Sequence, residues 1–161
     1  MSILLKNLLP EKAENVYEGY KIAKITFLII TIVTIIRSLI HLIAPDGGAE
    51  SIATINLNVE GGNIIVSIFA LWGVSQLLMS IVFLVVFFRY KNLIPFMYML
   101  IIIEYMMRIG VGVLKPFETV GIAPGVVGNY IMVPLAVILL LLSILKPNKK
   151  NKKVENSAKE S

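Results

Sequence analysis

The chain alternates four long apolar stretches with shorter polar ones. The apolar stretches cover residues 25–44, 63–88, 93–114 and 126–145. A helix needs about 20 apolar residues to cross about 30 Å of hydrocarbon, and in lipid a helix pairs its backbone groups within itself. The pattern therefore predicts an all-α fold, a polytopic four-helix membrane bundle over residues 25–146.

The segment before the first span, residues 1–24, has the pattern of a membrane interface. Residues 2–9 place apolar side chains on one side of a short helix that Pro10 ends, and a second helical pattern leads from Glu11 through two tyrosines into the first span. Tyrosine is typical of the boundary between lipid and water. We therefore predict an interfacial N-terminal segment.

The C-terminal residues 147–161 have a different composition. They contain a cluster of lysines and no apolar run, which predicts a disordered segment. Lysines clustered beside a span are attracted to the anionic lipids of the inner leaflet. We therefore expect a basic cytoplasmic tail that contacts these lipids.

The connection between the first two spans, residues 45–62, carries three carboxylates and no Lys or Arg. Its segment TINLNVE, residues 54–60, alternates apolar and polar side chains, which predicts a short strand or an interfacial lid.

Basic residues near the span ends indicate the orientation in the membrane. Only Lys115 lies on the side of the acidic connection. The opposite side carries Lys6, Lys12, Lys21, Lys24, Arg89, Lys91 and the C-terminal cluster. Because cytoplasmic segments are enriched in Lys and Arg, we predict a multi-pass protein of the cell (inner) membrane with both termini cytoplasmic. The net charge of +5 has the same explanation, so no nucleic-acid partner is expected.

Polar residues in three of the spans fall at matching depth. Counted at about 1.5 Å per residue, Arg37 and Arg108 both lie about 10 Å below the outer boundary. His41 is one turn above Arg37, and Glu104 is one turn below Arg108, each on the same helix face. In the second span, Trp72 and Gln76 lie at depths on either side of that of Glu104. The predicted cluster comprises Arg37, His41, Trp72, Gln76, Glu104 and Arg108.

Charge balance makes this cluster a candidate binding site. A charge deep in a bilayer costs at least about 2.5–3.5 kcal/mol, so such side chains usually face the protein interior or a wet cavity. Two Arg and one Glu leave one cation uncompensated, because arginine keeps its proton. Either a loop carboxylate, Asp46 or Glu60, folds inward as a lid, or the pocket is wet, or a small anionic or polar ligand completes it. The plainer interpretation is that Glu104 pairs with Arg108 or Arg37 and only fixes the helix register, with Gln76 and Ser75 filling the remaining hydrogen bonds.

Residue counts disfavour several other functions. The chain has no Cys and one His, which excludes thiolate nucleophiles, disulfides and Cys-ligated metal sites. General acid–base catalysis usually needs two tunable groups, and the spans offer one Glu and one His. We therefore expect no catalytic residue, no metal site and no cofactor.

Two stretches resemble a known group of proteins. RSLIHLIAPDGGAESIA, residues 37–53, and EYMMRIGVGVLKP, residues 104–116, resemble small uncharacterised bacterial four-span proteins of the broad DoxX-like group. The shared layout is an Arg and a His late in the first span, Pro-Asp opening the outer loop and a charged third span. Some members of that group are linked to respiratory or thiol-redox membrane complexes. The glycine-rich first span of the group is missing, because residues 25–44 contain no Gly.

These observations give a leading hypothesis and two alternatives. The leading hypothesis is a non-enzymatic binding or accessory subunit whose bundle holds an outward-facing polar pocket, within a homodimer or a larger membrane complex. The first alternative is a small proton-coupled transporter or exporter that acts as a dimer and depends on Glu104. The second is an enzyme whose turnover depends on His41 and Glu104.

Overall fold

The computed structural model describes residues 3–116 and 118–147, and every regular element within these ranges is a helix. In chain order the elements are α1 (Ile3–Leu8), α2 (Lys21–Ile43), α3 (Gly62–Arg89), the 3₁₀ turn η1 (Lys91–Leu93), α4 (Ile94–Leu114) and α5 (Pro124–Ile144). Four of these helices are long and apolar enough to cross a membrane. The predicted all-helical architecture is thus confirmed for the described residues. The basic cluster of the C-terminal tail lies outside them.

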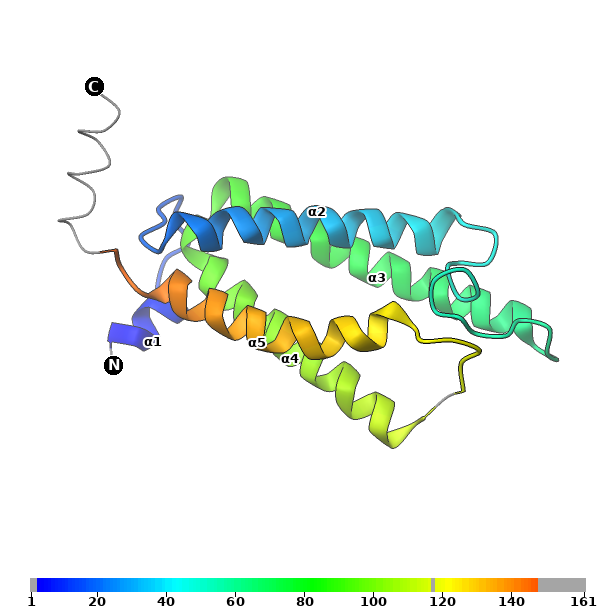
Figure 1. Cartoon of the computed structure of the whole chain (residues 1–161). Coiled ribbons are helices and arrows are strands. Elements are labelled where there is room, and N and C mark those ends of the chain that lie inside the picture. Colours follow the sequence, from blue (N-terminus) through cyan, green and yellow to red (C-terminus); the bar gives the residue numbers. More distant parts are fainter. Residues whose placement is uncertain (1–2, 117, 148–161) are drawn as a thin grey trace, which may run out of the picture.

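The four long helices form two antiparallel pairs. α2 packs along α3, and α4 packs along α5 (Figure 1). The pairs converge at the end that holds α1, η1 and the last turn of α5, which we name the terminal end. They diverge toward the opposite end, where residues 44–61 and 115–123 connect the helices; we name this the loop end.

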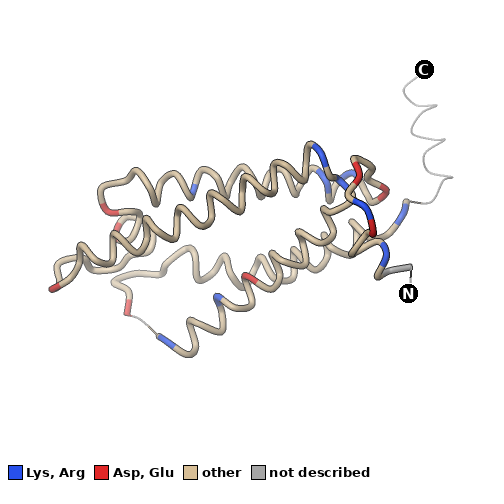
Figure 2. The backbone as a smooth tube through the Cα atoms, turned by 180° about the vertical axis from the view of Figure 1, so that it is seen from behind, with Lys and Arg blue, Asp and Glu red and all other residues tan. Residues whose placement is uncertain are grey.

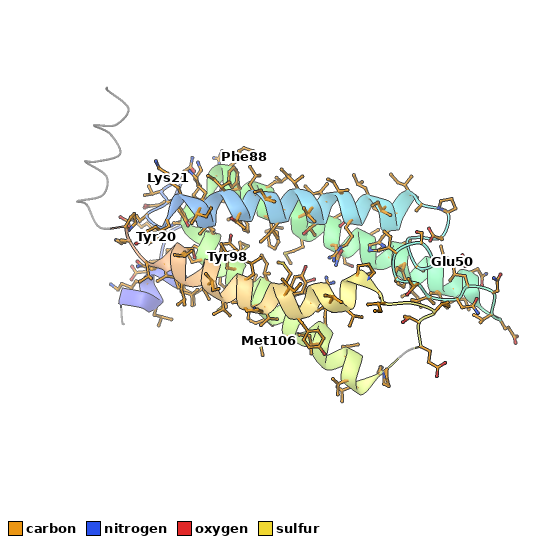
Figure 3. All side chains as sticks on the ribbon, in the orientation of Figure 1. Tyr20, Lys21, Glu50, Phe88, Tyr98 and Met106 are labelled. Carbon is orange, nitrogen blue, oxygen red and sulfur yellow. The ribbon has the colours of Figure 1, made fainter. Side chains whose placement is uncertain are left out.

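A close-packed apolar core joins the two pairs near the terminal end. Phe27 of α2 contacts the rings of Phe83 of α3 and Tyr98 of α4, with ring centroids 5.3 Å and 5.7 Å away. The buried Tyr98 hydroxyl donates a hydrogen bond of 2.6 Å to the Ala23 carbonyl, and the side chain points between the helix pairs (Figure 3). All four long helices contribute to this core, whose buried members are Ala23, Phe27, Phe83, Val86, Ile94, Met97, Tyr98, Ile101, Ala136 and Leu139.

The segment between α1 and α2 is not helical, so the second helical pattern predicted from Glu11 is wrong. Tertiary hydrogen bonds take the place of helical ones here. The Asn92 amide donates to the Lys12 carbonyl at 2.7 Å and its oxygen accepts from the Glu14 N–H at 2.8 Å. At the other side of this segment, the Tyr20 N–H donates to the Leu142 carbonyl. The segment is therefore held across η1 and α5.

Residues 44–61 form turns, so the strand predicted over residues 54–60 is wrong. Backbone bonds within the loop, such as those from Ala53 to Gly48 and from Ile55 to Ala49, close it on itself, and Ala49 is fully buried. Thr54 has a φ of 54°, which is rare for a β-branched residue. Its carbonyl accepts from the Val120 N–H at 2.8 Å and its hydroxyl donates to the Gly121 carbonyl at 3.0 Å. The two loops are thus joined across the loop end.

The outer surface of the long helices is apolar. Large side chains such as Phe88 and Met106 point away from the bundle (Figure 3) and are mostly exposed. Lysines and arginines gather at the terminal end, and long tan stretches separate the few charged positions within the helices (Figure 2). Such a surface costs little in contact with lipid and much in contact with water.

Candidate functional site

The polar residues of α2 and α3 face each other in two layers, one helical turn apart. In the layer nearer the terminal end, Arg37 Nη2 donates to Gln76 Oε1 at 3.0 Å. In the next layer the His41 ring stacks on Trp72, with centroids 5.0 Å apart. Gly73 lets the helices approach this closely, because a Cβ there would lie 2.8 Å from His41 Cβ. The small residue therefore brings the two polar faces together.

Trp72 joins this layer to the second helix pair. The Arg37 guanidinium carbon lies 5.6 Å from the indole ring, and that of Arg108 on α4 lies 4.9 Å from it. Both cations thus lie within cation–π distance of one aromatic side chain, where each contact contributes about 0.5–2 kcal/mol. This agrees with the equal depth predicted for the two arginines.

Arg108 and Glu104 form an ion pair one turn apart on α4. Arg108 also lies over the Tyr105 ring, with its guanidinium carbon 5.1 Å from the centroid. The Arg108 side chain is 17% exposed and that of Glu104 is 43% exposed. The glutamate therefore forms the accessible side of the cluster, while Arg37, which interacts electrostatically with it, lies deeper.

The His41 side chain is held in one tautomer by the loop that follows α2. Its Nδ1 lies 2.7 Å from the Gly47 carbonyl oxygen. A carbonyl oxygen only accepts hydrogen bonds, so Nδ1 carries the proton and, in neutral His41, Nε2 carries a lone pair. Gly47 and Gly48 adopt φ values of 59° and 73°, which bring this turn against the imidazole.

Within the described part of the chain, three buried side-chain polar atoms have no hydrogen-bond partner in the protein. They are Arg37 Nε, His41 Nε2 and Gln76 Nε2. His41 is 3% exposed and Gln76 is 5% exposed, so solvent does not reach these side chains freely. Each unpaired buried polar group costs about 1–3 kcal/mol. All three belong to the two layers between α2 and α3.

The two loop carboxylates proposed as lids do not join the cluster, which corrects that expectation. Asp46 accepts hydrogen bonds from the backbone N–H groups of Ser51 at 2.7 Å and Gly48 at 3.0 Å. These bonds lower the pKa of Asp46 to about 2. Glu60 is exposed in the turn before α3. Asp46 thus shapes the turn that contacts His41, and neither carboxylate neutralises an arginine.

Two aromatic residues of the cluster were missed by the sequence reasoning. Phe69 lies with its ring edge toward both His41 and Trp72, at centroid distances of 5.5 Å and 5.8 Å. Tyr105 packs under Arg108. Their spacing could have indicated them, because residues three apart lie on the same helix face. Phe69 precedes Trp72 by three residues, and Tyr105 precedes Arg108 by three. Ser75, which was expected to help, bonds within its own helix to the Leu71 carbonyl.

A cavity of about 300 Å³ lies elsewhere, between the segment before α2, η1 and the end of α5. Among its lining residues are Asn7, Tyr17, Asn92 and Ser143. The hydroxyl and amide groups there donate to the carbonyls of Ile144, Tyr20, Lys12 and Leu140. The case for a ligand at the polar cluster therefore depends on its unpaired atoms and its charge, and not on this cavity.

Among the described residues, no three His, Asp or Glu side chains come together. Compared with known protein families, curated proteins and solved structures, the chain matches none of them. The residues of the cluster themselves are thus the basis for any functional proposal.

Proposed function

We propose that the chain is an integral protein of the cell membrane that crosses it four times, with both termini in the cytoplasm. In this proposal the polar cluster binds a small anionic or polar molecule, and the protein acts as a binding or accessory subunit and not as an enzyme. The observation that carries the proposal is the set of three unpaired buried atoms on Arg37, His41 and Gln76.

The charges of the cluster support an anionic ligand. Glu104 pairs with Arg108, whereas Arg37 bonds to Gln76, a neutral amide. One positive charge is therefore left without a counter-charge in an apolar surrounding, where charges interact strongly. An anion held by the free Nε donor of Arg37 and the free amide of Gln76 would supply both the charge and the hydrogen bonds.

Thermal unfolding of the full chain in detergent tests this binding site. Acetate, compared with chloride at the same ionic strength, should raise the unfolding temperature in a saturable way, because a ligand that binds only the folded state stabilises it. Arg37→Gln should abolish the increase. Lys115→Gln, which removes an exposed loop-end cation, should keep it. Equal responses of both variants, or no response of the unmodified protein, would contradict the proposal.

The orientation is supported by the concentration of Lys and Arg at the terminal end (Figure 2). It can be measured directly, because the chain has no Cys and a single introduced thiol reports one position. Glu50→Cys at the loop end should react with a membrane-impermeant thiol reagent in intact cells. Glu11→Cys at the terminal end should react only after permeabilisation. The reverse pattern would contradict cytoplasmic termini.

The transporter alternative has one observation in its favour, the 43% exposed carboxylate of Glu104 within a candidate span. Ionisable side chains within membrane spans are typical of proton relays. Proton-driven flux that Glu104→Gln abolishes in a folded protein would support it. The resemblance to the DoxX-like group is supported by the four-helix layout alone and stays a prediction, as does assembly into a homodimer or a membrane complex.

A further inference from the structure

We propose that the polar cluster binds a small carboxylic acid together with one proton, and that His41 Nε2 is the atom that requires the proton. This inference depends on the proposed function, because it specifies the ligand of the same site. Its basis is the hydrogen-bonding character of the three unpaired atoms, because two of them are donors and one is an acceptor.

Two of the three atoms can only donate. Arg37 Nε carries one hydrogen, and the Gln76 amide nitrogen carries two, since the amide oxygen already accepts from Arg37 Nη2. Both therefore require a hydrogen-bond acceptor such as a carboxylate oxygen. They lie in the layer nearer the terminal end.

The third atom is an acceptor. His41 Nδ1 donates to the Gly47 carbonyl, so Nε2 of the neutral ring has a lone pair and no hydrogen. An anion beside it would place two acceptors against each other. A proton between Nε2 and the ligand oxygen removes this repulsion, whether it stays on the acid or moves to the imidazole. In one carboxyl group, the hydroxyl can donate to His41 Nε2, and the carbonyl oxygen can accept from the donors of the layer nearer the terminal end.

The spacing of the layers suits a small ligand. Arg37 and His41 are four residues apart on α2, which is a rise of about 6 Å. A carboxyl group with one hydrogen bond of about 2.8 Å on either side bridges such a distance. The route to these buried atoms would start from the accessible side of the cluster, where Trp72 is 37% exposed. Its contact with Arg108 connects two helix pairs that already diverge toward the loop end (Figure 1).

Other titratable groups near His41 could produce a pH dependence of their own, so a pH experiment must distinguish their protonation from that of His41. On its own helix the neighbour is Arg37, which does not titrate. The α3 neighbours Phe69 and Trp72 carry no charge. The α4 groups of the cluster are Glu104, Tyr105 and Arg108, and the loop contributes Asp46, which stays ionised far below neutral pH. Glu104 is therefore the one competing carboxyl group and needs its own variant.

Trp72 provides the readout, because it is the single tryptophan of the chain and stacks on His41. Acetate is titrated into the full chain in detergent, and the dissociation constant is taken from Trp72 emission at several values between about pH 5 and 8. If one proton is bound with the ligand, the dissociation constant should rise up to about tenfold per pH unit toward the alkaline end. In His41→Gln binding should persist without this pH dependence, and Glu50→Gln, which removes an exposed carboxylate of the same loop, should behave like the unmodified protein.

The outcomes separate this inference from the proposed function. Acetate binding with a pH-independent dissociation constant would overturn the inference and leave the proposed function in place. A pH dependence that Glu104→Gln removes and His41→Gln retains would also overturn it, because the proton would then reside on the carboxylate. If acetate changes neither Trp72 emission nor the unfolding temperature at any pH, both proposals are wrong.

Discussion

The terminal half and the loop half of the bundle are built from the same four apolar helices but are held together by different chemistry. In the terminal half, all four helices contribute to one apolar core around Phe27 and Tyr98. In the loop half, the helix pairs diverge, and the contacts between them are polar ones such as that of Trp72 with Arg108 and those of Thr54 with the second loop. The comparison indicates that stability resides in the first half, while the second keeps costly unpaired polar groups.

Removing the central ring of the terminal core should give the largest loss of stability. Phe27 is fully buried between Phe83 and Tyr98. We expect Phe27→Ala to lower the free energy of unfolding by about 3–5 kcal/mol, through lost burial and the cavity left behind. Phe88→Ala, the same change at an outward-facing position, should have little effect. Thermal unfolding in detergent measures both, and similar losses would remove the distinction between core and surface.

Removing the carboxylate of the cluster should give the second largest loss. Glu104→Leu leaves Arg108 unpaired, and the loss of a charged hydrogen bond of this kind costs about 1.5–3 kcal/mol. Arg37→Leu should cost less, because it removes the uncompensated cation and leaves two neutral groups, the Gln76 amide and the Tyr105 hydroxyl, without their partner. Unfolding free energies of the two variants check this order. Equal losses would mean that the net charge of the cluster carries no energetic consequence.

A smaller loss is expected when the α2–α3 layers are pushed apart. The Cβ of Gly73→Ala would lie 2.8 Å from His41 Cβ and 3.0 Å from the Ser38 carbonyl oxygen. Overpacking of this kind costs about 1–3 kcal/mol, and we expect the lower end because the helix pair can shift. Trp72 emission should change with it, since His41 stacks on that ring. Gly110→Ala, where a Cβ meets open space, should leave Trp72 emission unchanged and should not lower the stability, because Ala favours a helix interior over Gly.

The smallest effect concerns the loop that holds His41. The folded-state pKa of Asp46 is lowered from 3.8 to about 2, so its carboxylate contributes stability that is present above its ordinary pKa and is lost as the pH falls through about 2. The stability difference between the unmodified protein and Asp46→Asn should therefore be constant above about pH 4 and should vanish toward about pH 2. A difference that changes near neutral pH would assign the titration to another group.

The four long helices could be predicted from the sequence, because the length and apolar composition of a span are local properties of the chain. The four helices begin and end within a few residues of the predicted positions. The short strand at residues 54–60 was wrong because loop closure around Gly48 and Ala49, and the contact of Thr54 with the second loop, outweigh a weak alternating pattern. The non-helical segment before α2 was missed for a related reason, since its partner Asn92 is far away in the sequence.

The polar members of the candidate site were predicted from the sequence, but their pairing and two of the aromatic members were not. Counting depth brings Arg37 and Arg108 to one level and places Trp72 nearer to the depth of Glu104, and the two cation–π contacts join Trp72 to both arginines. The spacing does not determine which arginine pairs with Glu104 and which bonds to Gln76, because this depends on the directions of the side chains. The role of Asp46 as a turn-forming residue depends on the φ values of two glycines, which a charge count cannot reveal.

Imidazole ¹⁵N NMR shows whether the unpaired atoms around His41 form a ligand site. His41 is the single histidine of the chain, so a [¹⁵N]histidine-labelled protein without a histidine tag gives one pair of ring signals. At a pH where the ring is neutral, we predict a protonated Nδ1 and an unprotonated Nε2 without acetate. Added acetate should then shift the Nε2 signal toward the protonated value, by more if the proton moves to the imidazole than if it stays on the acid. Ring signals that do not change over the whole titration would contradict the account.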